Sequence, residues 1–466
     1  MTTPIPQPKG LPLLGNLLAM DSKNPWASFN KLSQSPAHRP IFKISILSHE
    51  IVFVTSAALL EEICDESRFR KCVTGPILEI RAAVHDSLFT AKHSEMEIWG
   101  IAHRIMKPLV SPQAIENVFD DILSTTGELI AKWTAASKQR VSATGDLDRN
   151  NHAANMLAFF HQKVDVMEGP EPAVIAAQQN ATTESLRRPS RPKLLTWLMG
   201  HGRRYETDIK TMRDYGAGIV QKRRENESSA PKDMLHALLH GVDPESGRSL
   251  SESQVLDEII NIFIGSATAP NLLSFAMYYL CRNPEVVAKA REELDAVVGN
   301  GPFTHAHLKT IPYTEAILRE TLRLSATAPG FNIEALPSDG DEPVLLAGGE
   351  YSIPRNQPLI ALLTAVNRDP AVFEDPLSFN PDRMVGEKYD ALPSGVKKGF
   401  GNGKRQCFGT RYAWEWSLLV LASIIKDVDV ELADKSYTVD NAGTNYNGAF
   451  STRPLGFYLL VSPRQK

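Results

Sequence analysis

The longest run of apolar positions in the chain lies between residues 251 and 282. Apolar residues would occupy nearly every side of a helix formed by this segment, which is typical of a helix buried inside a protein. Ser251 and Gln254 have the spacing of a capping box, and Asn283 with Pro284 ends the pattern. About 32 residues of helix would be roughly 48 Å long at 1.5 Å per residue. The pattern therefore predicts one long, buried helix.

Shorter segments repeat either the helical or the strand pattern. Helices are predicted over residues 58–69, 99–136, the 150s, 284–298, 313–324 and 414–426, with a mobile loop or short surface helix within the basic segment 187–204. Strands are predicted over 41–56, 343–349 and 351–365, and a closing hairpin includes 456–461. Helices dominate, with a small sheet near each end. Because the chain shows no internal repeat and no linker, a single domain over 1–466 is expected.

Composition excludes some classes of function. The formal net charge of -4 and 42% hydrophobic residues are ordinary for a soluble globular protein and do not suggest a nucleic-acid binder. The N-terminal segment holds four prolines between positions 4 and 12 and no apolar run long enough for a signal sequence or a membrane span. A chain of this size can bury a pocket for a bulky ligand.

The four cysteines are scattered along the chain. Cys64, Cys72, Cys281 and Cys407 form no C-x-x-C pair, so neither a disulfide framework nor a cysteine-rich metal site is indicated. This usage favours a reducing compartment, and a cytoplasmic location is expected.

Cys407 stands out because of its neighbours. The segment FGNGKRQCFG surrounds it with glycines, which permit positive φ and a close approach to a flat group, and with Lys404 and Arg405. Positive charge lowers the pKa of a thiol and suits a carboxylate partner. Cys407 would be a nucleophile, a redox thiol, a metal ligand or a small buried hydrophobic residue.

The metal-ligand interpretation needs the fewest additional residues. A nucleophile needs a histidine base at a recognised spacing, and a redox thiol needs a second cysteine nearby; neither is found. A single protein thiolate leaves the other metal positions to a non-protein group, and a porphyrin supplies four nitrogens at once. Haem is therefore the metal group that requires the fewest additional protein ligands.

Three motifs, in order along the chain, carry a family resemblance. They are Glu320-x-x-Arg323, Phe379-x-Pro381-x-Arg383 and Phe400-x-x-Gly403-x-Arg405-x-Cys407-x-Gly409. Together they resemble the cytochrome P450 family over essentially the whole chain. The segments CDESRF, SLFT, LLSFAMYYL and TAPGF are most similar to the haem domains of self-sufficient fatty-acid hydroxylases, which are fused to a flavin reductase. The resemblance implies a mainly helical fold in which haem lies between the long distal helix and the proximal cysteine loop.

The resemblance also implies roles for individual residues. Cys407 would bind the iron of haem b as a thiolate that favours O–O cleavage. Arg405, Trp99 and His103 would be partners of the haem propionates, and Phe400 would complete the cofactor-binding set. For Trp99 and His103, ordinary packing is the alternative. The resemblance makes the Glu320, Arg323 and Arg383 cluster structural.

The chain departs from the family pattern on the distal helix. Where the family places an acid before a threonine, this chain has Ala267 before Thr268, followed by Pro270. Proline has no N–H for the carbonyl of Ser266, so a local kink and a freed carbonyl are expected. Ser266, Thr268 and water would then deliver protons in an ordinary monooxygenase. The alternative is a rearrangement, dehydration or oxidative C–C cleavage without dioxygen activation.

The expected substrate is lipophilic, either fatty-acyl or polyketide-like. The resemblance places an apolar pocket over the haem, lined by Phe89, Leu88, Ala328, Phe331 and Ala267, with core packing as the alternative for each. At the channel mouth, the arginine and tyrosine that hold a carboxylate in related enzymes correspond to His49 and Phe53. These two make a poor anion clamp, which argues against a free fatty acid.

Dioxygen and an electron source complete the expected partners. Electrons would come from NADPH through the FAD and FMN of a flavin reductase, either fused to a longer chain or separate. Lys397, Lys398, Lys404 and Arg405 would attract an acidic flavoprotein, or would form a merely solvated basic face. A non-catalytic haem protein that senses or stores a gas is the alternative from another class.

Overall fold

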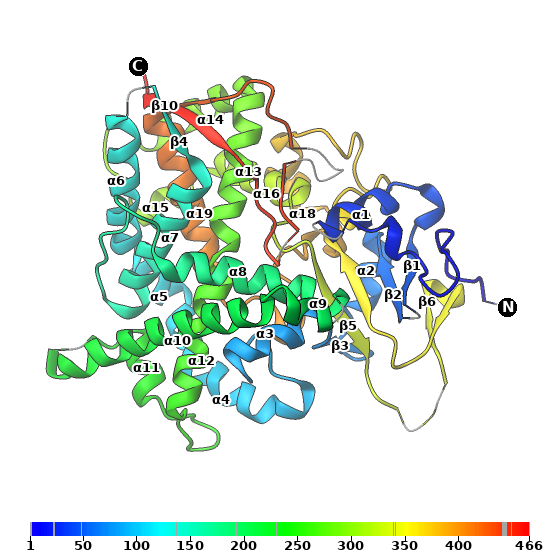
Figure 1. Cartoon of the computed structure of the whole chain (residues 1–466). Helices are drawn as coiled ribbons and strands as arrows, with labels where there is room; N and C mark the ends of the chain where they lie inside the picture. The colour runs from blue at the N-terminus through cyan, green and yellow to red at the C-terminus, as the bar shows by residue number, and fades with distance from the viewer. Residues whose placement is uncertain are drawn as a thin grey trace. The chain divides into compact units, whose positions relative to one another are not determined.

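The computed structural model describes residues 2–21, 24–47, 49–136, 138–191, 193–229, 231–338, 340, 342–439, 445–448 and 450–465. Helices predominate and the strands are short, as predicted (Figure 1). The chain packs into two compact units. Unit 1 contains residues 1–72, 316–407 and 438–455, and unit 2 contains residues 73–315, 408–437 and 456–466. The prediction of a single domain stays a prediction.

Unit 1 is built on a five-stranded sheet with the strand order β1-β2-β8-β5-β3. Its strands are β1 (Ile41–Ile46), β2 (His49–Val54), β3 (Phe69–Lys71), β5 (Gly330–Ala335) and β8 (Leu359–Leu362). Only the β2–β8 pair is parallel among these described strands, and its central register places Phe53 opposite Ile360. A separate antiparallel pair joins β6 (Val344–Leu346) to β7 (Tyr351–Ile353). The strands predicted within residues 41–56, 343–349 and 351–365 are therefore confirmed.

Short helices accompany these sheets. Those of unit 1 are α1 (Pro25–Ser33), α2 (Ala57–Ile63), α17 (Leu363–Val366) and α18 (Gly386–Asp390), while α16 (Pro312–Leu324) continues from unit 2 into unit 1. Ser56 caps α2 by accepting a hydrogen bond from the Leu59 N–H.

Unit 2 is a helical assembly with a three-stranded sheet of order β4-β10-β9. The strands are β4 (Gln139–Ser142), β9 (Val428–Leu432) and β10 (Tyr458–Pro463). The helices are α3 (Pro76–Val84), α4 (Met96–Met106), α5 (Pro112–Asn117), α6 (Phe119–Ala135), α7 (Ala143–Phe160), α8 (Ala173–Arg187), α9 (Lys193–Leu198), α10 (His201–Glu225), α11 (Met234–His240), α12 (Glu252–Ser266), α13 (Thr268–Arg282), α14 (Pro284–Val297), α15 (His305–Leu308) and α19 (Thr410–Asp427). The final residues form one strand, β10, which pairs with both β4 and β9; because β9 ends at Leu432 and β10 begins at Tyr458, the predicted closing hairpin is wrong and the terminal segment is the central strand of this sheet.

Sequence signals explain several helix starts. Proline occupies the first position of α3, α5 and α14, where its missing N–H would have had no helical partner. The capping box at Ser251 and Gln254 is formed, because each residue's backbone N–H donates to the other's side chain.

The long apolar helix spans Glu252–Arg282 and is interrupted only at Ala267, where the sequence predicts a local kink. α12 ends at Ser266, α13 begins at Thr268, and Ala267 between them has φ −66° and ψ −15°. The expected freed carbonyl is present, since the Ser266 carbonyl accepts a hydrogen bond from Asn151 Nδ2 at 2.9 Å. Pro270 causes the break because its nitrogen carries no hydrogen for that carbonyl.

Replacing Asn151 by alanine is expected to destabilise the fold by about 1–3 kcal/mol, because the Ser266 carbonyl would lose its donor in a partly buried position. The change is measured as the free energy of unfolding in urea. Gln113→Ala, which removes an exposed side-chain hydrogen bond to Asn117, is the control and should cost much less. Equal losses of unfolding free energy in the two variants would contradict a stabilising role for the hydrogen bond from Asn151 to the Ser266 carbonyl.

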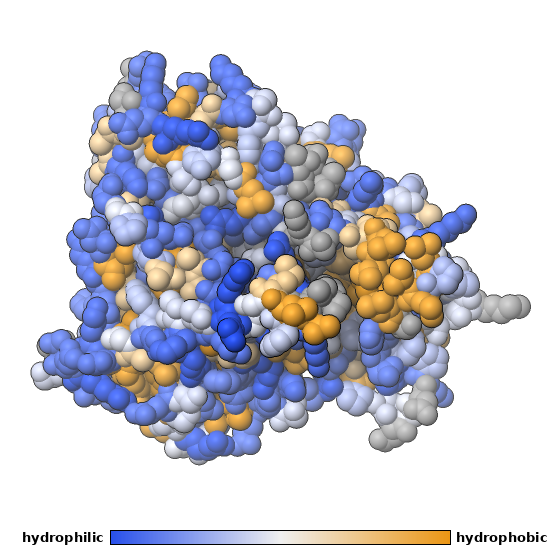
Figure 2. Space-filling view, viewed as in Figure 1, coloured by the Kyte–Doolittle hydropathy of each residue, from blue (hydrophilic) through white to orange (hydrophobic). Residues whose placement is uncertain are grey.

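Apolar side chains also reach the surface. Figure 2 shows them gathered over α9, where Leu194, Trp197 and Leu198 are each more than 60% exposed, so the basic segment contains a short surface helix. By length and composition, residues 252–282 would suffice to cross a membrane, yet 61% of the most apolar window is buried within the protein, as in the core helix of a soluble protein.

Candidate functional site

The cysteine loop of unit 1 presents the Cys407 side chain at an exposed position. Gly401 and Gly403 adopt φ +83° and +61°, while Gly409 has an ordinary φ of −84° and precedes α19. The Cys407 N–H donates to the Phe400 carbonyl at 2.8 Å, which closes the loop. The positive φ values explain why glycine is needed at two of the three positions.

A neighbouring turn holds this loop in place. Asn402 Nδ2 donates to the Cys64 carbonyl at 2.7 Å, and the Lys404 N–H donates to Glu66 Oε1 at 3.1 Å. A Cβ atom on Gly403 would lie only 2.2 Å from the Glu66 carboxyl carbon. The loop conformation is therefore fixed by residues more than 330 positions away in the sequence.

Two cations accompany Cys407. Burial lowers the pKa of Arg405 to about 10. Burial also lowers the pKa of Lys71 to about 7, with a further lowering by the charge of Arg405 and an opposing effect of Cys407. Lys71 was missed in the sequence because no spacing links it to Cys407; only the position of β3 brings it there. Lys71 and Arg405 together form a site that favours an anionic group.

The other cysteines differ from Cys407 in their surroundings. Burial raises the pKa of Cys64 to about 11 and those of Cys72 and Cys281 to about 12, so these thiols stay protonated at neutral pH. Within the described residues, no group of three or more His, Cys, Asp or Glu side chains is arranged to hold a metal ion. A metal at Cys407 would therefore take its remaining ligands from a non-protein group.

The expected ion-paired cluster is present in unit 1. Arg323 donates to both Glu320 oxygens at 2.7 Å, and Arg383 Nε lies 3.5 Å from Glu320 Oε1. Arg323 also donates to the carbonyls of Asn367, Pro376 and Ser378. Because the Glu320 and Arg323 side chains are 0% and 2% exposed, their charges depend on these partners.

The basic residues near the loop have local contacts. Lys398 donates to Asn402 Oδ1 at 2.7 Å, and Lys397 donates to the Asp390 carbonyl at 2.9 Å. Lys404 is exposed. These partners are neutral, so the positive charges remain uncompensated by them.

Other predicted residues of unit 1 lie on or next to its main sheet. Ala328 precedes β5 and is half-buried, and Phe331 on β5 is half-buried against the core of unit 1. His49 begins β2 and is exposed. Phe53 is fully buried and stacks on Phe42 at a centroid distance of 5.0 Å, so within unit 1 it packs as a core residue.

In unit 2, Trp99 and His103 lie one helical turn apart on α4. Their rings stack with centroids 4.5 Å apart, and both side chains are half-buried. His103 also makes an edge contact with Phe408, the residue that follows Cys407 in the chain. This i, i+4 arrangement presents both ring N–H groups from the same helix.

Most residues between 261 and 268 of the α12–α13 segment are partly exposed, whereas Phe263 and Ala269 are buried. Asn261, Gly265 and Thr268 lie on one side of the helix, and Gly265 is exposed; these three residues are called the open face. Ala267 is half-exposed and carries no polar group. Thr268 Oγ1 donates to the Gly265 carbonyl at 3.1 Å.

Ser266, the other predicted proton-relay residue, uses its hydroxyl in the same way. Its Oγ donates to the Phe263 carbonyl at 2.7 Å. The hydroxyl oxygens of Ser266 and Thr268 can still accept hydrogen bonds.

The predicted pocket residues Leu88 and Phe89 follow α3. Phe89 packs against an apolar cluster that includes Ile260 and Ile264 of α12, and Leu88 is buried. The Leu88 N–H donates to Glu258 Oε1 at 2.9 Å. Burial raises the pKa of Glu258 to about 8, against an opposing effect of this hydrogen bond. Sequence analysis missed Glu258 because it lies in an otherwise apolar helix.

Glu258 should make stability depend on pH. In the unfolded chain the carboxyl ionises near pH 4.5, whereas the folded protein keeps the proton up to about pH 8. Stability due to this group is therefore lost as pH rises from 4.5 to 8, by about 3–5 kcal/mol in total. Glu258→Gln is expected to remove this contribution. The free energy of unfolding in urea at pH 5 and pH 8 measures this contribution. If it depended on pH equally in Glu258→Gln and in the unmodified protein, Glu258 would not be the group responsible.

Within unit 1, the residues of the cysteine loop fit a haem by their chemistry. Cys407 offers an exposed sulfur for the iron, and Arg405 with Lys71 offers basic groups for the propionates. Within unit 2, Trp99 and His103 present ring N–H donors on α4. The open face of α12–α13 has a glycine at its centre, where a flat group meets no side chain.

Comparison with known proteins agrees with this fit. A family model described as Cytochrome P450 matches residues 5–461. The chain is 36% identical over 444 residues to the bifunctional cytochrome P450/NADPH–P450 reductase ascE of Acremonium egyptiacum, covering 94% of this chain and 41% of that protein. It is 33% identical over 470 residues to the self-sufficient cytochrome P450 monooxygenase CYP505E3 of Phanerodontia chrysosporium, covering 100% and 43%. The chain thus spans less than half the length of these relatives.

Proposed function

Because the chain belongs to the cytochrome P450 family, whose cofactor is haem, we propose that it is the haem-thiolate module of a monooxygenase. In this proposal the module oxidises a lipophilic substrate, fatty-acyl or polyketide-like. The observation that carries the proposal is the exposed Cys407 thiol in a closed glycine loop beside Arg405 and Lys71. When bound, haem supplies the activation of dioxygen.

The residues predicted to bind the haem would have two separate roles, one toward the iron and one toward the propionates. Cys407 would bind the iron, while Arg405, Lys71, Trp99 and His103 would hold the propionates by charge-assisted hydrogen bonds. Phe400 would keep the loop closed through its carbonyl. These roles support binding and orientation of the cofactor.

The residues on the substrate side would exclude water and move protons. The pocket would be lined by Leu88, Phe89, Ala328 and Phe331. His49 occupies the position where related enzymes carry an arginine, so the site would lack a strong cation to hold a free carboxylate. Ser266 and Thr268 would pass protons through their hydroxyl oxygens.

Electrons would come from NADPH through FAD and FMN of a reductase, fused or separate. The names of the relatives, which include an NADPH–P450 reductase, support this partner. Lys397, Lys398 and Lys404 would attract its acidic surface. We include a cytoplasmic location in the proposal, since Cys64, Cys72 and Cys281 form no disulfide.

A second candidate is a rearrangement, dehydration or C–C cleavage of an already oxygenated substrate. The specific observation in its favour is the apolar Ala267 at the half-exposed position where the family carries an acid.

The test is turnover under labelled dioxygen with NADPH, a flavin reductase and a panel of long-chain and aromatic lipophilic substrates. The proposal expects labelled oxygen in the product. Product without label would support the second candidate, and no conversion at all would support a gas-binding protein. Cys407→Ser is the control that should form no product.

A further inference from the structure

Polar residues form a stripe along one side of the distal segment. Gln254, Glu258, Asn261, Gly265 and Thr268 follow one another at intervals of three or four residues, which places them on one helical face. The last three make up the open face. Glu258 lies one turn before it and is only 2% exposed. A buried acid therefore stands at the inner end of the open face.

Glu258 is joined to the open face by a hydrogen bond. Asn261 Nδ2 donates to Glu258 Oε2 at 3.1 Å, while the other carboxyl oxygen accepts the Leu88 N–H, so both oxygens of Glu258 accept hydrogen bonds. Asp86 and Asp257 are the charged groups that act on Glu258, and both disfavour a second negative charge. Asp257 itself is paired with Arg213 and His85. Glu258 thus keeps its proton at neutral pH.

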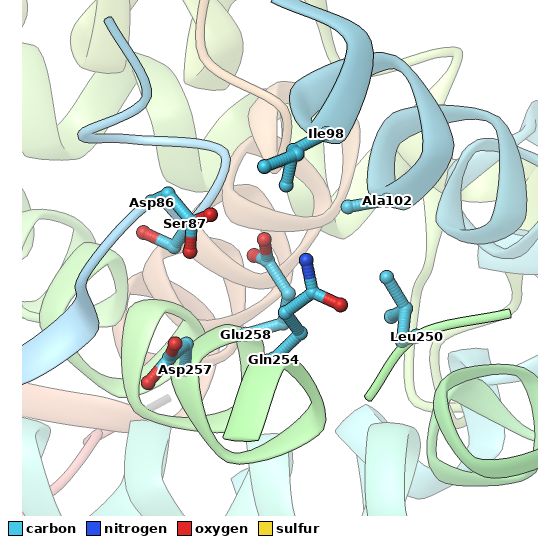
Figure 3. A pocket seen from close by; sticks show the side chains of 8 residues that line it. All are labelled: Asp86, Ser87, Ile98, Ala102, Leu250, Gln254, Asp257 and Glu258. Atoms are coloured by element: carbon cyan, nitrogen blue, oxygen red, sulfur yellow. The ribbon is translucent and has the colours of Figure 1, made fainter. Parts of the chain in front are cut away.

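Glu258 also borders a narrow surface pocket. The pocket is lined by Asp86, Ser87, Ile98, Ala102, Leu250, Gln254, Asp257 and Glu258. Figure 3 shows the carboxyl of Glu258 and the amide of Gln254 side by side and directed into it, with the helix α4 contributing only Ile98 and Ala102. Asp86, Ser87 and Gln254 are the polar residues that line this pocket beside Glu258 and Asp257.

We propose that Glu258 supplies protons to the open face through Asn261 and Thr268, in place of the acid that is absent at Ala267. This inference rests on the proposed monooxygenase function. Glu258 acts through other residues and is a positioning residue: it holds a transferable proton at the end of the open face.

The proton balance is simple. The O–H bond of the Glu258 carboxyl breaks and its proton passes to solvent at the open face. The hydroxyl oxygen of Thr268 accepts a proton from that solvent as its own O–H proton passes on to the group being protonated, so Thr268 is unchanged at the end. The carboxylate that remains lies beside Asp86 and Asp257, so it is quickly reprotonated from solvent through the pocket. No electron moves in these steps.

The first test needs no turnover. Infrared difference spectra of the protein between pH 6 and pH 9.5 should contain the C=O band of a protonated carboxyl that disappears with a pKa of about 8. Glu258→Gln should remove this band. Glu415→Gln, which changes another carboxyl whose pKa burial raises, is the matched control and should leave it. A band that persists in Glu258→Gln would overturn the proposal.

The second test measures product formed per NADPH consumed by the haem-loaded enzyme with its reductase. Glu258→Gln should lower this ratio about tenfold, with more hydrogen peroxide, and should abolish its fall above pH 8. Substrate affinity by equilibrium dialysis should not change, because the glutamine oxygen still accepts the Leu88 N–H. Glu258→Asp should restore part of the ratio.

Asn261→Leu provides a second variant in case the first folds poorly. It should lower the ratio in the same way while the infrared band remains. A wild-type ratio and pH profile in either variant would overturn the proton route. If the wild-type enzyme incorporates no labelled oxygen from any substrate, the proposed function fails, whereas the infrared result still reports on Glu258.

Discussion

Replacing Cys407 by serine is expected to abolish the thiolate-type absorption of the reduced carbon monoxide complex and to reduce monooxygenase turnover to background. The physical reason is that a serine hydroxyl stays protonated at neutral pH and donates far less electron density to iron than a thiolate. The absorption spectrum of the reduced protein under carbon monoxide measures the change.

The other cysteines provide matched controls for this result. Cys64→Ser and Cys281→Ser remove thiols that burial keeps protonated, so both variants should keep the thiolate-type spectrum. An unchanged spectrum in Cys407→Ser would refute the ligand assignment, and loss of the spectrum in Cys281→Ser would show that the cysteine was wrongly chosen.

Replacing Arg323 by alanine is expected to destabilise the fold by about 3–5 kcal/mol. The change leaves the Glu320 carboxylate, which is 0% exposed, without its two shortest ionic hydrogen bonds. It also removes the donor for three backbone carbonyls. Urea unfolding of haem-free protein measures the loss without any contribution from cofactor binding.

A surface ion pair provides the control for this loss of stability. Lys210 and Asp214 are paired on α10 with side chains 75% and 62% exposed, and Lys210→Ala should cost no more than about 0.5 kcal/mol. If Arg323→Ala were as mild as this control, the cluster would not be the structural support that its burial indicates.

Local patterns in the sequence were enough for much of the fold. The capping box at Ser251, the proline at Pro284 and the motif around Cys407 each depend on backbone rules that act within a few residues. The structure forms both helix starts and closes the cysteine loop, and the freed carbonyl of Ser266 follows from Pro270 alone. Such features are predictable because their causes lie next to each other in the chain.

Other features had no local signal. The burial of Phe53 had no local signal, because alternation along β2 does not say which face is buried; the sheet places Phe53 against Phe42. The freed carbonyl of Ser266 follows from Pro270, but the residue that donates to it, Asn151, lies 115 residues away and no local pattern identifies it. Long-range partners decided both outcomes.

The sequence by itself determined the family and the helix starts that follow Ser251 and Asn283, because these depend on motif spacing and on the intrinsic geometry of capping residues and proline. Only the tertiary structure placed Lys71 beside Arg405 and Glu258 beside Leu88. Removal of water from an ionisable group depends on every segment that packs around it. For this reason the charge states of the site, and the proton route proposed from them, required the folded chain.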